Sequence, residues 1–386
     1  MRLRKKAASG LAALLLFLPG LAYAAPLETG APITLTSPAV ILAEAATGTV
    51  IYEKNADERR EVASVTKLMT VLLIFEELER GGITLKDSVQ VSKTAAAMKG
   101  SQALLDADAV YPLEELLKTT IIASANDSAV ALAEYILGSE EAFVEKMNDR
   151  AKELQMENTH YVNCTGYPQQ GQYTTARDVV RVSCEMSKHP AYHAYAKIWM
   201  DTLTHPGGRI TDLTNTNRLV RFYESADGFK TGSTDAAKYC ISATAQKNGL
   251  RLIAVVLGNE KSQTRFDEAR NLLEYGFNNY KRIEIAKTGS LLGQSIPVKR
   301  GSSETVDVAL GSGLSMLLKN GQEKGLKIEV ELPESLQAPV LKGDIIGTAR
   351  VKLDNQVVAK INCVAAGDVP LPGLLEGIYR IFNTWR

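Results

Sequence analysis

Three short polar stretches, far apart in the chain, carry side chains that could catalyse acyl transfer. The first is Ser64-Val65-Thr66-Lys67. Lys67 follows Ser64 by about one helical turn, so its amine can reach the hydroxyl. A buried amine near a second cation loses its proton more readily, and a neutral Lys67 could then activate Ser64 as a nucleophile. Alternatively, Ser64 caps a helix and Lys67 extends into solvent.

The second stretch is Ser124-Ala125-Asn126, between an apolar run and the start of a predicted helix. In a catalytic site, Ser124 would relay a proton, and the amide of Asn126 would contact both the substrate and Lys67. The alternative is structural, because Asn126 or Asp127 could cap the helix.

The third stretch is Lys230-Thr231-Gly232, at the start of a predicted strand. Gly232 would let another backbone approach the strand closely. Lys230 would supply the second positive charge, and the strand could bind an extended peptide by β-addition. Alternatively, this is an edge strand that a lysine protects from aggregation.

The order of the three motifs is more informative than any one of them. Ser64 and Ser124 are 60 positions apart, and Ser124 and Lys230 are 106 apart. Ser-x-x-Lys, Ser-x-Asn and Lys-Thr-Gly are typical of penicillin-binding proteins and class A β-lactamases. The chain resembles the low-molecular-mass penicillin-binding proteins that are serine-type D-alanyl-D-alanine carboxypeptidases. The resemblance extends over nearly the whole mature chain, through "AATGTVIYEKNAD", "NTHYVNCTGYPQQGQYTTARDVV", "DGFKTGSTDAAKYC" and "TRFDEARNLLEYGF".

The resemblance implies a role for each motif residue. The catalytic residues would be the nucleophile Ser64, its base Lys67 and the relay Ser124. The substrate would be bound by Asn126, Lys230, Thr231, Gly232, Ser233 and Arg265. The backbone N–H groups of Ser64 and Ser233 would form the oxyanion hole, and Arg265 would help to hold the terminal carboxylate. The chain departs from the family at Val62, where a proline is common, which would alter the stiffness of the loop.

The same resemblance implies that the protein removes the terminal D-alanine from peptidoglycan pentapeptides through an acyl-enzyme on Ser64. It also implies that no cofactor or metal is needed and that β-lactams bind the protein covalently. A class A β-lactamase would need a deacylating glutamate, and "HYVNCTGYPQQG" contains none. A transpeptidase would pass the acyl group to an amine, which fits a single catalytic domain with a short anchor less well. A non-catalytic penicillin-binding scaffold is the alternative from another class of protein.

The elements that position these residues indicate an α+β catalytic domain. Two predicted hairpins, Pro38 to Tyr52 and one around Asn248-Gly249, flank a helical region, so one sheet should join strands from both sequence ends. The helix of the first motif is predicted to start at Ser64. Further helices are predicted at Leu113 to Thr120, Asp127 to Leu137, Glu140 to Leu154, Thr175 to Ser187 and Arg265 to Phe277.

Four regions follow from these patterns and the resemblance. They are a signal peptide (1–24), a β-lactamase/transpeptidase-like domain (25–283), a small all-β sandwich (284–369) and an amphipathic helix (370–386). The last should lie in the membrane interface, or else pack on the β domain. The basic start, short apolar core and Ala22-Tyr23-Ala24 favour cleavage over a retained anchor. The protein is therefore expected outside the cytoplasm, on the outer face of the cytoplasmic membrane; a protein partner of the β domain is not predicted.

Composition excludes other classes. Lys+Arg and Asp+Glu are both 44, so no basic surface for nucleic acid is indicated. The spacing of the four cysteines matches no metal motif, and unpaired, mostly buried thiols are favoured over the three possible disulfide pairings. His189 and His193 could share a helical face, but no carboxylate motif accompanies them, so no metal site is predicted.

Overall fold

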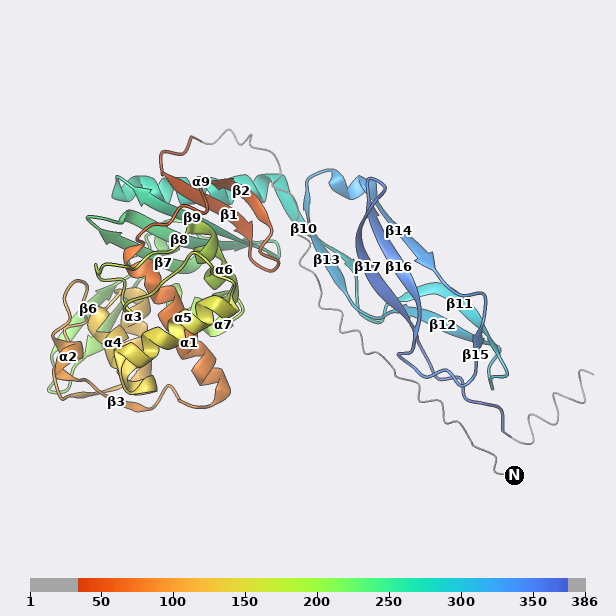
Figure 1. Cartoon of the computed structure of the whole chain (residues 1–386), viewed down its shortest axis with the longest axis horizontal. Helices are drawn as coiled ribbons and strands as arrows, with labels where there is room; N and C mark the ends of the chain where they lie inside the picture. Colours follow the sequence, from red (N-terminus) through yellow and green to blue (C-terminus); the bar gives the residue numbers. More distant parts are fainter. Residues whose placement is uncertain (1–33, 374–386) are drawn as a thin grey trace, which may run out of the picture.

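The computed structural model describes residues 34–373 (Figure 1). A part built from helices and a sheet contains all three motifs, and a smaller all-β part follows it. The predicted signal peptide (1–24) and residues 374–386 of the predicted C-terminal helix lie outside the described residues. The first four residues of that predicted helix, 370–373, are described and are not helical.

A five-stranded antiparallel sheet, in the order β2-β1-β9-β8-β7, supports the catalytic part. Its strands are β1 (Ala39–Glu44), β2 (Val50–Lys54), β7 (Ala226–Thr234), β8 (Lys238–Lys247) and β9 (Leu250–Asn259). Both predicted hairpins are confirmed, and β1 pairs with β9, so the sheet joins the two sequence ends as predicted. Asn248 and Gly249 have φ of 50° and 77°, as a type I′ turn requires.

Helices cover both faces of this sheet because its buried strands are apolar on both sides. One face packs α9 (Ser262–Asn279), and the other packs the main group of helices. That group contains α1 (Lys67–Arg80), α3 (Leu113–Ile122), α4 (Asn126–Leu137), α5 (Glu140–Glu153) and α6 (Ala176–Met186). Each corresponds to a predicted helix, and Thr175 caps α6 by accepting a hydrogen bond from Asp178 N.

Smaller elements complete the catalytic part. They are the 3-10 helix η1 (Ala63–Thr66), α2 (Lys93–Ala96), α7 (Pro190–Ala196), α8 (Leu219–Phe222), the pair β3 (Ser88–Gln90) and β4 (Val110–Pro112), and the hairpin of β5 (Met200–Thr204) and β6 (Ile210–Thr214). The 3-10 helix corrects one prediction: Ser64 lies in η1, and the α-helix itself begins at Lys67.

The all-β part begins with β10 (Tyr280–Ala286), which pairs with β13 (Leu314–Lys319). A six-stranded sheet in the order β14-β16-β17-β12-β11-β15 encloses a separate apolar core. Its strands are β11 (Leu291–Lys299), β12 (Thr305–Leu310), β14 (Leu326–Glu331), β15 (Leu336–Gln337), β16 (Ile345–Leu353) and β17 (Gln356–Ala365), with a 3-10 turn η2 (Gln322–Gly325) before β14. Arg282 on β10 forms an ion pair with the buried Glu44 of β1, so this contact joins the all-β part to the catalytic part.

The cysteine prediction is confirmed, since all four thiols are free and only Cys184 is not fully buried.

His189 and His193 do not converge: His189 contacts Glu79, whereas His193 contacts the Asp227 carbonyl. Between residues 34 and 373, no helix is both long and apolar enough to span a bilayer.

Candidate active site

Ser64 lies on a tight turn, here called the nucleophile turn (residues 62–66), which contains η1, leads into α1 and packs against β7. Ala63, just before it, has a φ of 50°, an uncommon conformation for alanine of the kind that gathers at functional sites. Two glycines permit the packing around this turn. A Cβ on Gly166 would stand 1.9 Å from Ala63 O, and one on Gly232 would stand 2.9 Å from Ser64 N. The backbone that approaches Gly232 is therefore the nucleophile turn itself.

Lys67 is fully buried directly beside Ser64. Its Nζ donates to Ser64 Oγ at 3.1 Å, to Asn126 Oδ1 at 2.5 Å and to the Thr165 carbonyl at 2.8 Å. Burial lowers the pKa of Lys67 to about 7, although Cys164 and Asp127 act in the opposite direction. A substantial fraction of the amine is therefore neutral near neutral pH. The extended, solvent-reaching lysine of the alternative interpretation is excluded.

Asn126, the first residue of α4, contacts Lys67, and Ser124 lies two residues before it. Ser124 adopts a φ of 63°, and its Oγ is buried with no hydrogen-bond partner among the described residues. Asn126 uses both ends of its amide, since Oδ1 accepts from Lys67 and Nδ2 donates to the Lys99 carbonyl at 2.6 Å. The contact predicted between Asn126 and Lys67 is confirmed.

The capping interpretations of the first two motifs are wrong. Ser64 and Asn126 make no side-chain cap bond at the starts of η1 and α4. Asp127 instead accepts hydrogen bonds from the N–H groups of Ala103 (3.0 Å) and Leu105 (3.1 Å), besides its neighbour Ser128. Asp127 thus fixes the loop that precedes β4 against the Ser-x-Asn turn.

The third motif lies on β7, the edge strand of the sheet, which packs against η1. Lys230 is buried, and its Nζ donates to the Thr231 carbonyl at 3.2 Å. Burial brings the pKa of Lys230 well below its usual range, and the charges of Lys67 and Arg265 lower it further. The charge of Lys67 thus lowers the pKa of Lys230, whereas the lowered pKa of Lys67 comes from burial. The prediction that a second charge, from Lys230, lowers the pKa of Lys67 is therefore wrong.

Arg265 supports the end of β7 from the first turns of α9. Its Nη1 donates to the carbonyls of Gly232 (2.9 Å) and Cys240 (3.2 Å), and its guanidinium lies over the ring of Tyr239. Burial lowers the pKa of Arg265 to about 10, which leaves it charged at neutral pH. Ser233, one residue beyond Gly232, is exposed on the strand, where a ligand can reach it.

Comparison with known proteins agrees with this geometry. Residues 26–261 match the D-alanyl-D-alanine carboxypeptidase family, and residues 280–371 match the C-terminal domain of penicillin-binding protein 5. The chain belongs to the D-alanyl-D-alanine carboxypeptidase family. It is accordingly a serine-type D-Ala-D-Ala carboxypeptidase, a hydrolase of a family that acts on peptidoglycan stems and binds β-lactams.

Individual relatives cover nearly the same length. The D-alanyl-D-alanine carboxypeptidase DacF of Bacillus subtilis is 37% identical over 346 residues, which are 89% of each chain. DacC of Escherichia coli is 33% identical over 98% of this chain and 96% of the relative. The crystal structure of penicillin-binding protein 5 from Haemophilus influenzae superimposes with a TM-score of 0.76 at 28% identity, covering 88% of this chain and 99% of that one.

Sequence reasoning missed one group in this carboxypeptidase site, the Thr165 carbonyl that accepts from Lys67. Asn163 holds that loop, because its Oδ1 accepts the N–H groups of Thr165 (3.2 Å) and Gly166 (2.7 Å). A main-chain acceptor has no side-chain signature. The available signal was the Asn-Cys-Thr-Gly segment, whose asparagine and glycine favour a tight turn.

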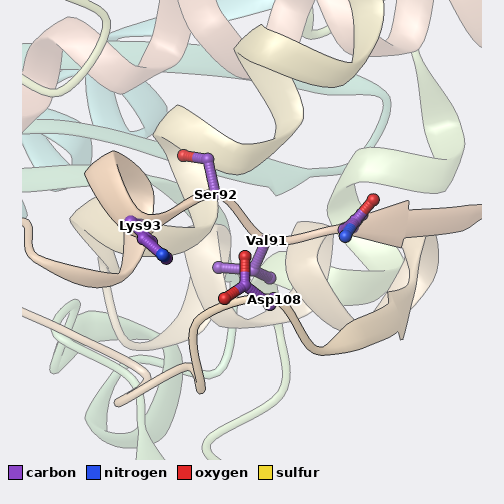
Figure 2. Close-up of a pocket in the computed structure, with 5 residues that line it drawn as sticks. Val91, Ser92, Lys93 and Asp108 are labelled. Atoms are coloured by element: carbon purple, nitrogen blue, oxygen red, sulfur yellow. The ribbon is translucent and has the colours of Figure 1, made fainter.

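A shallow pocket of about 420 Å³ lies elsewhere on the carboxypeptidase domain (Figure 2). It is lined by Gln90, Val91, Ser92, Lys93 and Asp108. Ser92 is already used there, since its Oγ accepts from Ala95 N and caps α2. The pocket contains none of the motif residues, so the hydrogen-bonded group around Lys67, rather than this hollow, marks the reactive centre.

Proposed function

We propose that this carboxypeptidase works through an acyl-enzyme on Ser64, with Lys67 as the base. The 3.1 Å contact between Lys67 Nζ and Ser64 Oγ, with the pKa of Lys67 lowered to about 7, carries the proposal. Lys67 takes the hydroxyl proton while Ser64 Oγ bonds to the carbonyl carbon between the two D-alanines. The negative charge on the carbonyl oxygen is stabilised by the N–H groups of Ser64 and Ser233.

Ser124 supports the second half of the acylation step. Its buried, unpartnered Oγ can accept the proton from Lys67 and donate to the departing amide nitrogen. The C–N bond then breaks, and D-alanine leaves with a neutral amine. Water repeats the sequence in reverse, with Lys67 removing its proton, and the Ser64 ester is hydrolysed.

The β7 edge and its neighbours hold the substrate in this scheme. The stem peptide adds to the edge of β7 along Thr231 and Gly232, where β-addition supplies main-chain hydrogen bonds. Asn126 contacts the peptide, and Lys230 and Arg265 attract its terminal carboxylate. The scheme requires no cofactor or metal.

Ser64→Ala tests the acyl-enzyme. The variant should release no D-alanine from a pentapeptide and should not label with fluorescent penicillin, while circular dichroism shows an unchanged fold. Ser92→Ala, whose hydroxyl only caps α2, is the matched control and should label normally. Penicillin labelling of Ser64→Ala at the wild-type level would contradict the assignment.

We further propose that the chain is exported, cleaved after Ala24 and held on the outer face of the cytoplasmic membrane by an amphipathic helix in the part of 370–386 that follows Gly373. In "LPGLLEGIYRIFNTWR" the apolar residues recur at helical spacing, and the segment is shorter than the roughly 20 residues that span a bilayer. A chain ending at Asp368 should keep its activity on soluble peptides and lose sedimentation with liposomes. Equal sedimentation of both chains would contradict the anchor.

A further inference from the structure

The described chain stops at the end of the β domain far from β10 (Figure 1). Exposed aliphatic side chains lie on the segments around this place. Leu341 is 61% exposed, Ile345 67% and Leu371 57%. Single exposed aliphatics are ordinary on a protein surface, but three of them gathered at one end of a domain indicate a contact surface.

Backbone hydrogen bonds join three segments into this surface, here called the distal tip (residues 299–303, 338–345 and 368–371). They link Val340 with Val369 in both directions, Ser302 N with the Pro370 carbonyl, and Ala338 N with the Lys299 carbonyl. Lys342 N also donates to Asp368 Oδ1 at 2.6 Å. The distal tip is therefore a defined shape and not a set of independent loops.

The distal tip carries both cations and carboxylates. Lys299, Arg300 and Lys342 are exposed there. Asp344 and Asp368 are exposed on the tip as well; each accepts a backbone N–H, from Leu341 at 2.7 Å and from Lys342 at 2.6 Å, and keeps its negative charge. Glu304 stands just beyond the first segment. Exposed aliphatic side chains, beside long cationic side chains that can reach the phosphates of anionic headgroups, are features of a surface that contacts the interface of a bilayer.

We propose that the distal tip is a second membrane contact, which inserts Leu341, Ile345 and Leu371 among the headgroups of an anionic bilayer. The proposal rests on the proposed C-terminal anchor for its orientation. The amphipathic stretch continues directly from Leu371, so a helix lying in the interface would bring the distal tip against the same surface. Two contacts on one domain would fix both the height and the tilt of the catalytic part above the membrane, which a single contact would not.

Sedimentation of the full mature chain with vesicles of phosphatidylglycerol and phosphatidylethanolamine tests the tip. The double variant Leu341→Ser/Ile345→Ser should bind about tenfold more weakly, because two aliphatic side chains no longer enter the interface. The matched control is Ile328→Ser/Val357→Ser, at two exposed aliphatics (43% and 45%) on strands of the same domain outside the tip. The control should bind like the wild type; equal loss in both double variants would overturn the proposal.

Charge variants give an independent readout. Neutralising the tip in Lys299→Gln/Arg300→Gln/Lys342→Gln should weaken binding on the order of a hundredfold on these vesicles. The same triple variant should bind pure phosphatidylcholine vesicles as the wild type does. Unchanged binding to the anionic vesicles would contradict the role of the cations.

A chain ending at Gly373 separates the tip from the anchor. If both proposals hold, it binds more weakly than the full chain, and Leu341→Ser/Ile345→Ser weakens it further. If only the tip is wrong, the double substitution has no effect in either chain. If only the anchor is wrong, truncation has no effect and the double substitution alone removes binding.

An environment-sensitive fluorophore on Leu341→Cys distinguishes lipid from another occupant. Its emission should shift to the blue only when vesicles are added. The full chain could instead show a blue shift before lipid is added, with no such shift in the chain ending at Gly373. That result would show that residues 374–386 cover the tip, and it would overturn the proposal. A tip used only for a protein partner would give no shift with vesicles.

Discussion

Gly232 on β7 lies so close to Ser64 that a Cβ at residue 232 would stand 2.9 Å from the Ser64 nitrogen and 2.3 Å from the Val62 oxygen. Real Cβ atoms do not approach backbone this closely. The missing side chain therefore sets the distance between the nucleophile turn and the substrate strand, two segments that are more than 160 residues apart in sequence.

Gly232→Ala should separate that turn from β7. We expect acylation by penicillin to slow by on the order of a hundredfold, since a shift of about 1 Å at a reacting group can cost that much. Stopped-flow or gel-based labelling rates measure the effect. Gly367→Ala, where nothing lies within 4 Å of the added Cβ, is the control and should acylate normally. A Gly232→Ala protein with the wild-type rate would show that this spacing is not critical.

The acylation rate should rise with pH, with the steepest increase near pH 7. The pKa of Lys67 is lowered to about 7, so the fraction of neutral amine, the form that can accept the Ser64 proton, grows as pH rises through that value. Penicillin labelling rates between pH 5 and 9 measure this increase. Lys67→Arg should be nearly inactive at every pH, because its guanidinium stays protonated. A flat profile for the wild type, or acylation by Lys67→Arg at the wild-type rate, would remove the base role.

Local turn chemistry made much of the fold predictable. The Asn248-Gly249 turn appears as predicted, and the helix predicted from Thr175 to Ser187 starts where the Thr175 side chain caps α6. By contrast, α7 and the β5–β6 hairpin were not predicted. The β5 and β6 residues are largely exposed, with Leu203 and Leu213 as their buried positions, so their sequences show little apolar alternation.

The site was predictable by residue type but not by environment. The three motifs named Ser64, Lys67 and Lys230, yet only the packed structure shows that burial is the main cause of the lowered pKa of Lys67. The extent of burial depends on segments distant in sequence, such as the Thr165 loop, which supplies an acceptor to Lys67. A motif fixes which groups are present, whereas desolvation is set by the tertiary packing around them.

Asp127→Asn should destabilise the catalytic domain and loosen the loop beside Asn126. The buried carboxylate accepts from Ala103 N with one oxygen and from Leu105 N with the other, and an amide replaces one acceptor by a donor. One buried N–H then loses its partner, which costs about 1–3 kcal/mol. Chemical denaturation measures the loss. Asp149→Asn, at an exposed carboxylate on α5, should leave the midpoint unchanged. Equal midpoints for both variants would mean that the Asp127 contacts contribute nothing measurable.

Arg265 has two separable tasks, and paired substrates distinguish them. Its Nη1 braces the carbonyls of Gly232 and Cys240, while the family resemblance assigns it to the substrate's terminal carboxylate. Loss of the hydrogen bonds that position β7 should lower kcat/KM for every substrate alike. Loss of a contact to the terminal carboxylate should lower it only for substrates that have the carboxylate. The comparison therefore uses a peptide ending in D-Ala-D-Ala and the same peptide with a C-terminal amide.

Arg265→Leu should lower kcat/KM for the free acid by on the order of a hundredfold, because a charged hydrogen bond contributes about 1.5–3 kcal/mol and the brace is lost as well. It should lower kcat/KM for the amide much less, so the wild-type preference for the acid should largely disappear. Arg265→Lys keeps the charge but not the pair of hydrogen bonds to the carbonyls of Gly232 and Cys240, and it should retain part of that preference. If Arg265→Leu lost kcat/KM equally on the acid and on the amide, Arg265 would only position β7. The substrate carboxylate would then have to be held by other groups, of which Lys230 is the first to test.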